Sequence, residues 1–246
     1  MPVADSPAQR RGTFEDERAF QIRTTPTVLL LVVALYFVLV LNTAFWGLVL
    51  SNLDWKSSSS PLLIVQMGLF LFGLIVVVFS LVRFPSVLKP VLAVLLVASA
   101  AAAYFMNQYG ILIDDDMLRN ALQTDNAETA GLLNWTLAAY IAILGLLPAL
   151  IVIRTKLRWS GIVRNGMQSV AVLALGLGIA LGGGGADFKA SAPFVRAHGK
   201  QMRWRATPLN LVQASLRVAR EQRLLANPTP YTVIAKSVKI MAKKLK

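Results

Sequence analysis

The 246-residue sequence contains no cysteine, a single histidine and few charged residues for its length. Without cysteine, and with only His198 as an imidazole, it offers neither a disulfide framework nor a Cys/His zinc site. Charged residues make up 15% of the chain, whereas soluble globular proteins carry about 25%. No Ser/His/Asp motif and no phosphate-binding glycine loop is recognisable. The sequence by itself therefore indicates no catalytic or metal centre, and His198 is interpreted as a structural residue.

Hydrophobic residues are abundant instead, at 56% of the chain. Five apolar segments account for this excess, and each is close to the roughly 20 residues that a helix needs to cross a hydrocarbon core of about 30 Å. The first has no small-residue cleavage site behind it, so it is interpreted as a retained anchor. The sequence predicts an all-α fold, a polytopic membrane bundle of five transmembrane helices. The predicted spans are residues 27–50, 61–82, 89–106, 134–153 and 165–182.

Basic residues alternate with the predicted spans. The turn after the second span holds Arg83 and Lys89 without an acid, and the turn after the fourth is also purely basic. The loop at 107–133, by contrast, has Arg119 among five acids. Because Lys and Arg in short loops stay in the cytoplasm, the pattern predicts a cytoplasmic polar tail over residues 1–26. Five spans then place the C-terminus in the periplasm.

Residues 183–246 carry most of the positive charge, with thirteen Lys or Arg against two acids. The glycines at 182–185 predict the end of the fifth span and a flexible exit. Amphipathic helices are predicted beyond it, one over 209–226 and a lysine-rich one after Pro230. Such helices are typical of membrane interfaces. A solvated charge run, or a connector to another domain, stays an alternative. Nucleic-acid binding is disfavoured because this tail follows five spans.

The loop at 107–133 is long for a membrane bundle. On a helix Asn120, Thr124 and Glu128 share one face, because they are spaced four residues apart. An amide, a hydroxyl and a carboxylate can bind a polar lipid headgroup, although a solvated helix face explains the pattern equally well. The carboxylates at 114–116 point about 100° apart on a helix. They are interpreted as a helix start, with weak divalent-ion binding as the alternative.

The loop sequence MLRNALQTDNAET at 117–129 resembles the periplasmic loop of lipid A phosphoethanolamine transferases, a family that includes the mobile colistin-resistance enzymes and hence polymyxin resistance. Other stretches are similar to the same family, although the family has Asn-Pro where this chain has Thr207-Pro208. The likeness covers nearly all of residues 27–230. These stretches are LYFVLVLNTAFW at 35–46, NQYG at 107–110, GLLP at 145–148, FVRAH at 194–198 and TPLN at 207–210.

The resemblance implies a membrane domain in a bacterial inner membrane, followed in the family by a periplasmic catalytic domain. That domain holds zinc and a threonine nucleophile, and it transfers phosphoethanolamine from phosphatidylethanolamine to lipid A. The resemblance also implies that Asn120, Thr124 and Glu128 hold the lipid substrate. No threonine motif or zinc-ligand set is found in these 246 residues. We therefore expect no catalytic residue, metal or cofactor in this chain, whose residues 183–246 would precede a missing catalytic domain.

The expected domain order is the tail at 1–26, the membrane domain at 27–182 and linker helices at 183–246. One rival function is a non-catalytic membrane scaffold or lipid-binding protein with a basic interfacial tail. A small transporter is another. The span interiors contain almost no ionisable residue, which disfavours transport, and Asn42 and Gln66 are among the few polar side chains there.

Overall fold

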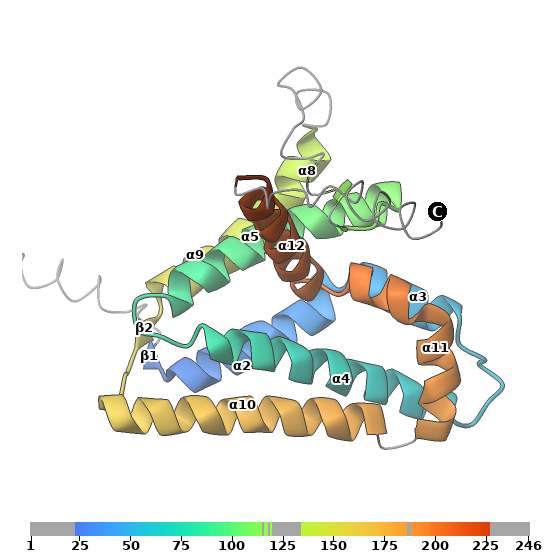
Figure 1. The fold of residues 1–246 in the computed structure, drawn as a ribbon, viewed down its shortest axis with the longest axis horizontal. Helices are drawn as coiled ribbons and strands as arrows, with labels where there is room; N and C mark the ends of the chain where they lie inside the picture. The colour runs from blue at the N-terminus through green and yellow to red at the C-terminus, as the bar shows by residue number, and fades with distance from the viewer. Residues whose placement is uncertain (1–22, 115, 118, 120–133, 186–187, 227–246) are drawn as a thin grey trace, which may run out of the picture.

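The computed structural model describes residues 23–114, 116, 117, 119, 134–185 and 188–226, and nearly all of this part is helical (Figure 1). Four of its helices are long and apolar enough to cross a membrane, and a bent helix pair near the N-terminus makes five if it counts as one span. The predicted all-α membrane bundle is therefore confirmed. Residues 1–22 of the predicted cytoplasmic tail and the lysine-rich segment after Pro230 lie outside the described residues.

The first span is divided into three pieces, and the fourth likewise contains a π-helix. Two short strands, β1 (Arg23–Thr24) and β2 (Lys156–Leu157), pair in parallel and bring the start of the first span to the connection between the fourth and fifth spans. The helices in chain order are α2 (Pro26–Tyr36), η1 (Phe37–Leu41), α3 (Thr43–Ser51), α4 (Ser60–Leu81), α5 (Leu88–Tyr109), α8 (Trp135–Tyr140), η2 (Ile141–Leu146), α9 (Leu147–Arg154), α10 (Ile162–Gly185), α11 (Phe188–Arg205) and α12 (Leu209–Ala226).

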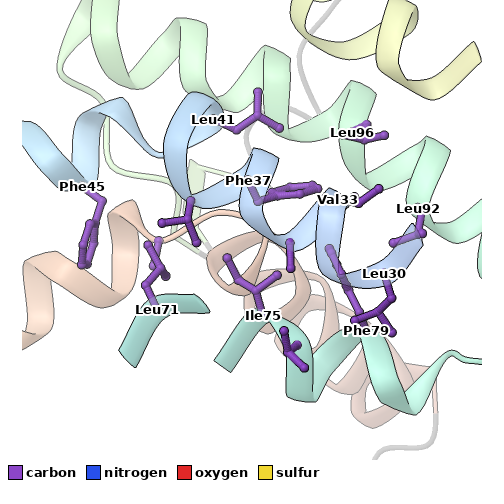
Figure 2. Packing of buried hydrophobic residues seen from close by; sticks show 14 of the residues in the cluster. Leu30, Val33, Phe37, Leu41, Phe45, Leu71, Ile75, Phe79, Leu92 and Leu96 are labelled. Carbon is purple, nitrogen blue, oxygen red and sulfur yellow. The ribbon is translucent and has the colours of Figure 1, made fainter. Parts of the chain in front are cut away.

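The main core lies where α2 and η1 pass between α4 and α5 (Figure 2). Phe37 of η1 and Phe79 of α4 are fully buried and meet edge to face, with ring centroids 5.4 Å apart. Leu92 and Leu96 of α5 cover the other side of the same segment. Apolar side chains gain little from leaving lipid, so this packing stabilises the bundle through close van der Waals contact.

Glycine allows α4 and α10 to pack backbone to backbone. A Cβ atom added at Gly73 would lie 2.5 Å from the Ala180 amide nitrogen and 2.6 Å from the Gly176 carbonyl oxygen. One added at Gly183 would lie 2.8 Å from the Phe70 nitrogen. Small residues at such crossings are the usual device of membrane helices. The glycine run at 182–185, which was predicted to be a flexible exit, is instead helical to Gly185, since Gly183 belongs to this interface.

Arg83 joins three spans at the basic end of the bundle. It is 3% exposed, and its guanidinium donates hydrogen bonds to the Asn165 carbonyl and to the side chains of Thr27, Gln168 and Ser169, at 2.9–3.1 Å. Burial lowers the pKa of this guanidinium below its ordinary value. Four neutral acceptors thus hold the starts of the first and fifth spans to the end of α4.

The π-helical segment of the fourth span is supported by a neighbouring helix. Pro148 has no N–H group, so the Leu144 carbonyl four residues earlier lacks its helical partner. The Tyr36 hydroxyl of α2 donates to that carbonyl oxygen at 2.8 Å. An unpaired carbonyl in a hydrocarbon environment costs several kcal/mol, and Tyr36 therefore fixes the first span against the fourth.

The first span bends by 56° at Asn42, between η1 and α3. The Asn42 amide nitrogen donates to the Phe37 carbonyl (2.8 Å) and to the Thr207 carbonyl (2.7 Å), and its oxygen accepts from the Thr207 N–H (2.8 Å). The Thr207 hydroxyl donates to Leu41 O, and the Trp46 indole donates to Val38 O. We call this set of hydrogen bonds, in which the Asn42 side chain bonds to the Thr207 backbone and the Thr207 hydroxyl to Leu41, the Asn42–Thr207 clasp. It satisfies backbone groups that the bend releases and seats the tail on the first span.

The described part of the tail consists of α11 and α12, which meet at the clasp. In Figure 1, α11 lies across the ends of α4 and α10, whereas α12 crosses in front of α5. The prediction of a helix over 209–226 is confirmed. Asn210 fixes the junction further, because its buried side chain donates to the Trp204 carbonyl at 2.9 Å.

Gly73→Ala should destabilise the fold, because the added methyl group meets backbone atoms that cannot move aside. We expect a loss of about 1–3 kcal/mol, seen as a lower midpoint of thermal unfolding in detergent. Gly178→Ala in α10 is the matched control, since a Cβ there meets nothing within 4 Å. Equal midpoints for the two variants would contradict the close helix crossing.

Asn42→Leu should loosen the tail while leaving the apolar core intact. The change leaves the Phe37 carbonyl and both Thr207 backbone groups without their partner, at about 1–3 kcal/mol for each unsatisfied group. We expect faster limited proteolysis at the arginines of α11 and α12. Asn52→Leu is the control, because among the described residues the Asn52 amide bonds only to its neighbours Leu48 and Ser51. Unchanged cleavage in Asn42→Leu would show that the clasp does not hold the tail.

Candidate functional site

The residues predicted to bind a lipid headgroup, Asn120, Thr124 and Glu128, lie outside the described residues. The structure does place Arg119 directly before them. Its guanidinium bonds to Asp116 at 3.0 Å and to Glu221 of α12 at 2.5 Å. The Glu221 carboxylate raises the pKa of the Arg119 guanidinium above its ordinary value. The chain entering the predicted site is thereby held against α12.

The chain is fixed again just after the predicted site. The Asn134 side-chain oxygen accepts from the Leu137 N–H at 2.8 Å and so caps α8. Its amide group donates to the Tyr104 hydroxyl at 2.7 Å. Tyr104 is 2% exposed and packs edge-on against Tyr109 and Tyr140. Both ends of the segment 120–133 are therefore anchored near the end of α5 that lies away from Arg83.

A cavity of about 500 Å³ lies beneath α11, between this helix, α3 and α4. We call it the α11 pocket. Its walls are almost entirely apolar, with two arginines as the charged groups. Its lining residues are Phe45, Met67, Phe70, Leu71, Leu74, Gly184, Ser191, Ala192, Val195, Arg196, Gly199, Met202, Arg203, Ala206 and Leu209.

Arg196 and Arg203 lie two helical turns apart on one face of α11, with Gly199 between them. Both side chains are exposed at the pocket. The other basic residues near them have partners elsewhere, because Lys200 lies over the Trp204 ring (4.7 Å) and Arg205 bonds to Gln201 (3.3 Å). The pocket therefore combines an apolar interior with two cationic groups.

Neither of the remaining polar features forms a metal site in the described part of the chain. Asp114 accepts a hydrogen bond from the Met117 N–H at 2.9 Å, which fits the interpretation of these acids as a helix start. His198 lies against Phe194, with ring centroids 4.8 Å apart and Nδ1 3.3 Å from the Phe194 carbonyl oxygen. Among the described residues there is no group of three or more His, Cys, Asp or Glu that could hold a metal ion.

Two of the intramembrane polar residues, Asn42 and Gln66, differ in their environment. Asn42 uses its amide in the clasp, as described above, which gives it a structural role. Gln66 is 1% exposed, and neither of its amide atoms has a hydrogen-bond partner in the described structure. Gln66 lies one turn before Phe70 on α4, but it does not line the α11 pocket.

The α11 pocket was not predicted from the sequence, although the spacing of residues along α11 contains a pattern that indicates it. Small residues and arginines alternate on one face of the helix at 192, 196, 199, 203 and 206, which are spaced three or four residues apart. This periodicity marks a helix face with an apolar partner. Pro193 inside the helix masked it, because proline normally interrupts a helical pattern.

Comparison with known proteins points to one family. Residues 71–223 match the family described as phosphoethanolamine transferase EptA/EptB. Phosphatidylethanolamine transferase Mcr-1 of Escherichia coli is 38% identical over 152 residues, which cover 56% of this chain and 28% of that protein. Phosphoethanolamine transferase EptA of Salmonella typhimurium is 28% identical over 200 residues, covering 81% of this chain and 36% of that protein.

A solved structure has the same fold. The integral membrane protein lipooligosaccharide phosphoethanolamine transferase A (EptA) from Neisseria meningitidis matches with a TM-score of 0.76 and 28% identity, over 86% of this chain and 39% of that chain. The chain thus spans about a third of the length of the curated relatives that it matches. The family match at residues 71–223 includes Thr207, all of α11, and the loop anchors Tyr104, Arg119, Asn134 and Glu221. The chain belongs to the phosphoethanolamine transferase EptA/EptB family, whose membrane domain it contains.

Proposed function

We propose that this chain anchors a phosphoethanolamine transferase in a bacterial inner membrane and presents phosphatidylethanolamine for transfer of phosphoethanolamine to lipid A. The names of the relatives support this substrate, since Mcr-1 and Mcr-2 are phosphatidylethanolamine transferases. We assign the zinc and the threonine nucleophile that the family resemblance implies to the part of the relatives that this chain does not match. The contribution of this chain is then binding and orientation of the donor lipid.

The headgroup site assigned here consists of Asn120, Thr124 and Glu128. The Glu128 carboxylate would pair with the ammonium group, and the amide and hydroxyl would donate to phosphate or glycerol oxygens. The observation that carries this assignment is the anchoring of both ends of the segment 120–133, through Arg119 on Glu221 and Asn134 on Tyr104. Anchored ends restrict where the headgroup can be held, and orientation is what a presenting domain must supply.

The orientation follows from the charges at the two ends of the bundle. Arg83, Lys89 and Arg158 lie at the end where β1 pairs with β2, and the Lys89 ammonium bonds to the Ile153 carbonyl there. Positive charge in short loops marks the cytoplasmic side. We place this end in the cytoplasm, with the headgroup site, α11 and α12 on the periplasmic side.

A chimera provides the test. This chain would replace the matching region of EptA from Salmonella typhimurium, and lipid A modification would be measured by mass spectrometry in cells that lack their own transferase. The unmutated chimera should modify lipid A. Glu128→Ala should lower modification about ten-fold at equal expression, because it removes a charge-assisted contact worth roughly 1.5–3 kcal/mol.

Asp125→Ala is the matched control, since it removes an acid of the same loop that is outside the predicted stripe. Full modification by Glu128→Ala would reject the headgroup assignment. An inactive but well-expressed chimera would count against the presenting role, and would favour the scaffold with a basic interfacial tail.

A further inference from the structure

The α11 pocket reaches the depth at which lipid acyl chains lie. Its wall on α4 extends from Met67 to Leu74, which are 7 and 14 residues beyond the start of the helix at Ser60. At 1.5 Å per residue these positions are about 10 and 21 Å along α4. The hydrocarbon core is about 30 Å thick. The α4 wall of the pocket therefore lies in about the middle third of the core.

The volume and lining of the pocket suit a hydrocarbon chain. About 500 Å³ is within the range of ligand pockets, roughly 300–1,000 Å³. The interior is formed by buried Phe45, Met67, Leu71 and Met202. Methionine and leucine side chains adapt to a flexible apolar ligand and offer it no hydrogen bond. A water-filled role would need polar partners that these walls do not provide.

The two arginines give the pocket its charge. Within the part of the chain that the structure describes, neither Arg196 nor Arg203 forms an ion pair or a side-chain hydrogen bond to a protein group. Arg205, two residues further on, does bond to a protein group, Gln201. Long basic side chains extend from apolar surface to the headgroup layer, and guanidinium groups bind phosphate in bidentate geometry.

We propose that the α11 pocket binds a glycerophospholipid, with an acyl chain in the cavity and the phosphate on Arg196 and Arg203. This site is additional to the headgroup stripe on the loop, and it does not depend on the transfer activity proposed above. The shared chemistry is that of a diacyl phosphodiester, so the donor phosphatidylethanolamine and an anionic phosphatidylglycerol both fit it. The test distinguishes these two sources.

Photolabelling tests the proposal directly. The 246-residue chain would be reconstituted in vesicles containing phosphatidylethanolamine or phosphatidylglycerol with a diazirine on one acyl chain, and labelled peptides would be mapped by mass spectrometry. We expect labelling to concentrate on Met67, Leu71 and Met202. Unlabelled phospholipid should compete, whereas diacylglycerol, which has the chains without the phosphate, should compete poorly.

Two variants separate the apolar contact from the phosphate contact. Gly199→Leu places a side chain into the cavity, because a Cβ there meets only Val195 at 3.7 Å, and should exclude the acyl chain. The double variant Arg196→Gln/Arg203→Gln should lower labelling about thirty-fold, because roughly 1 kcal/mol is lost for each of the two basic residues near the headgroups. Lys200→Gln and Arg205→Gln on the same helix do not line the pocket and should label normally.

The outcomes are distinct. Labelling by phosphatidylethanolamine alone would assign the pocket to the donor lipid. Equal labelling by both lipids would show that the pocket recognises the phosphate and not the rest of the headgroup. Either result supports the site. Labels spread evenly over exposed side chains of the bundle such as Leu39 and Val94 would overturn it. So would undiminished labelling in Arg196→Gln/Arg203→Gln with full competition by diacylglycerol. Because the assay involves no phosphoethanolamine transfer, failure of the chimera would not affect it.

Discussion

The arrangement of the bundle end that carries α11 and α12 depends on how the hydrogen-bonding groups released by the bend in the first span are satisfied. A helix that breaks within a membrane leaves carbonyl groups with no water to bind. Three side chains donate hydrogen bonds to these carbonyls. Asn42 donates to Phe37 O, Trp46 to Val38 O and Thr207 to Leu41 O. The third partner comes from a residue 166 positions away in the sequence. The bend can therefore form without penalty only when the tail is seated, and the tail is seated only where the bend exposes these groups. The bend in the first span and the docking of α11 and α12 therefore stabilise each other.

The spans themselves could be predicted from the sequence, because hydrophobic length and basic turns are properties of single segments. The helix at 209–226 was also predicted correctly, since Thr207-Pro208 precedes it and its apolar face repeats at helical spacing. The bend at Asn42 could not be predicted, because the segment is apolar on both sides and Asn42 is stabilised by a distant backbone. The contact that supports the fourth span near Pro148 could not be predicted either, because the Leu144 carbonyl accepts its hydrogen bond from Tyr36 of the distant first span.

The glycine run at 182–185 was wrongly predicted to end the helix, although it is helical to Gly185. Glycine lowers helix propensity by about 1 kcal/mol relative to alanine, so local reasoning predicts an exit from the helix. Contact with α4 reverses this preference, because at Gly183 only a hydrogen atom fits against Leu69 and Phe70. In the candidate site, the headgroup stripe was predicted from spacing and lies outside the described residues, so it stays a prediction. The α11 pocket could not be foreseen in full, because two of its walls come from helices more than a hundred residues earlier.

Helix α12 and the clasp connect the α11 pocket with Arg119, which directly precedes the predicted headgroup residues. Thr207 fixes the start of α12, and Glu221 on the same helix holds Arg119 next to the loop. From Leu209 to Glu221 the helix rises about 18 Å, at 1.5 Å per residue. α11, on the other side of the clasp, covers the pocket. A surface ion pair contributes little stability by itself. At the far end of a helix whose start is held by the clasp, however, the pair with Glu221 fixes the position of Arg119 relative to that helix. The distance between Arg119 and the α11 pocket is then set by the length of α12 and by the clasp, so a change at Thr207 would shift Arg119 relative to the pocket without altering either.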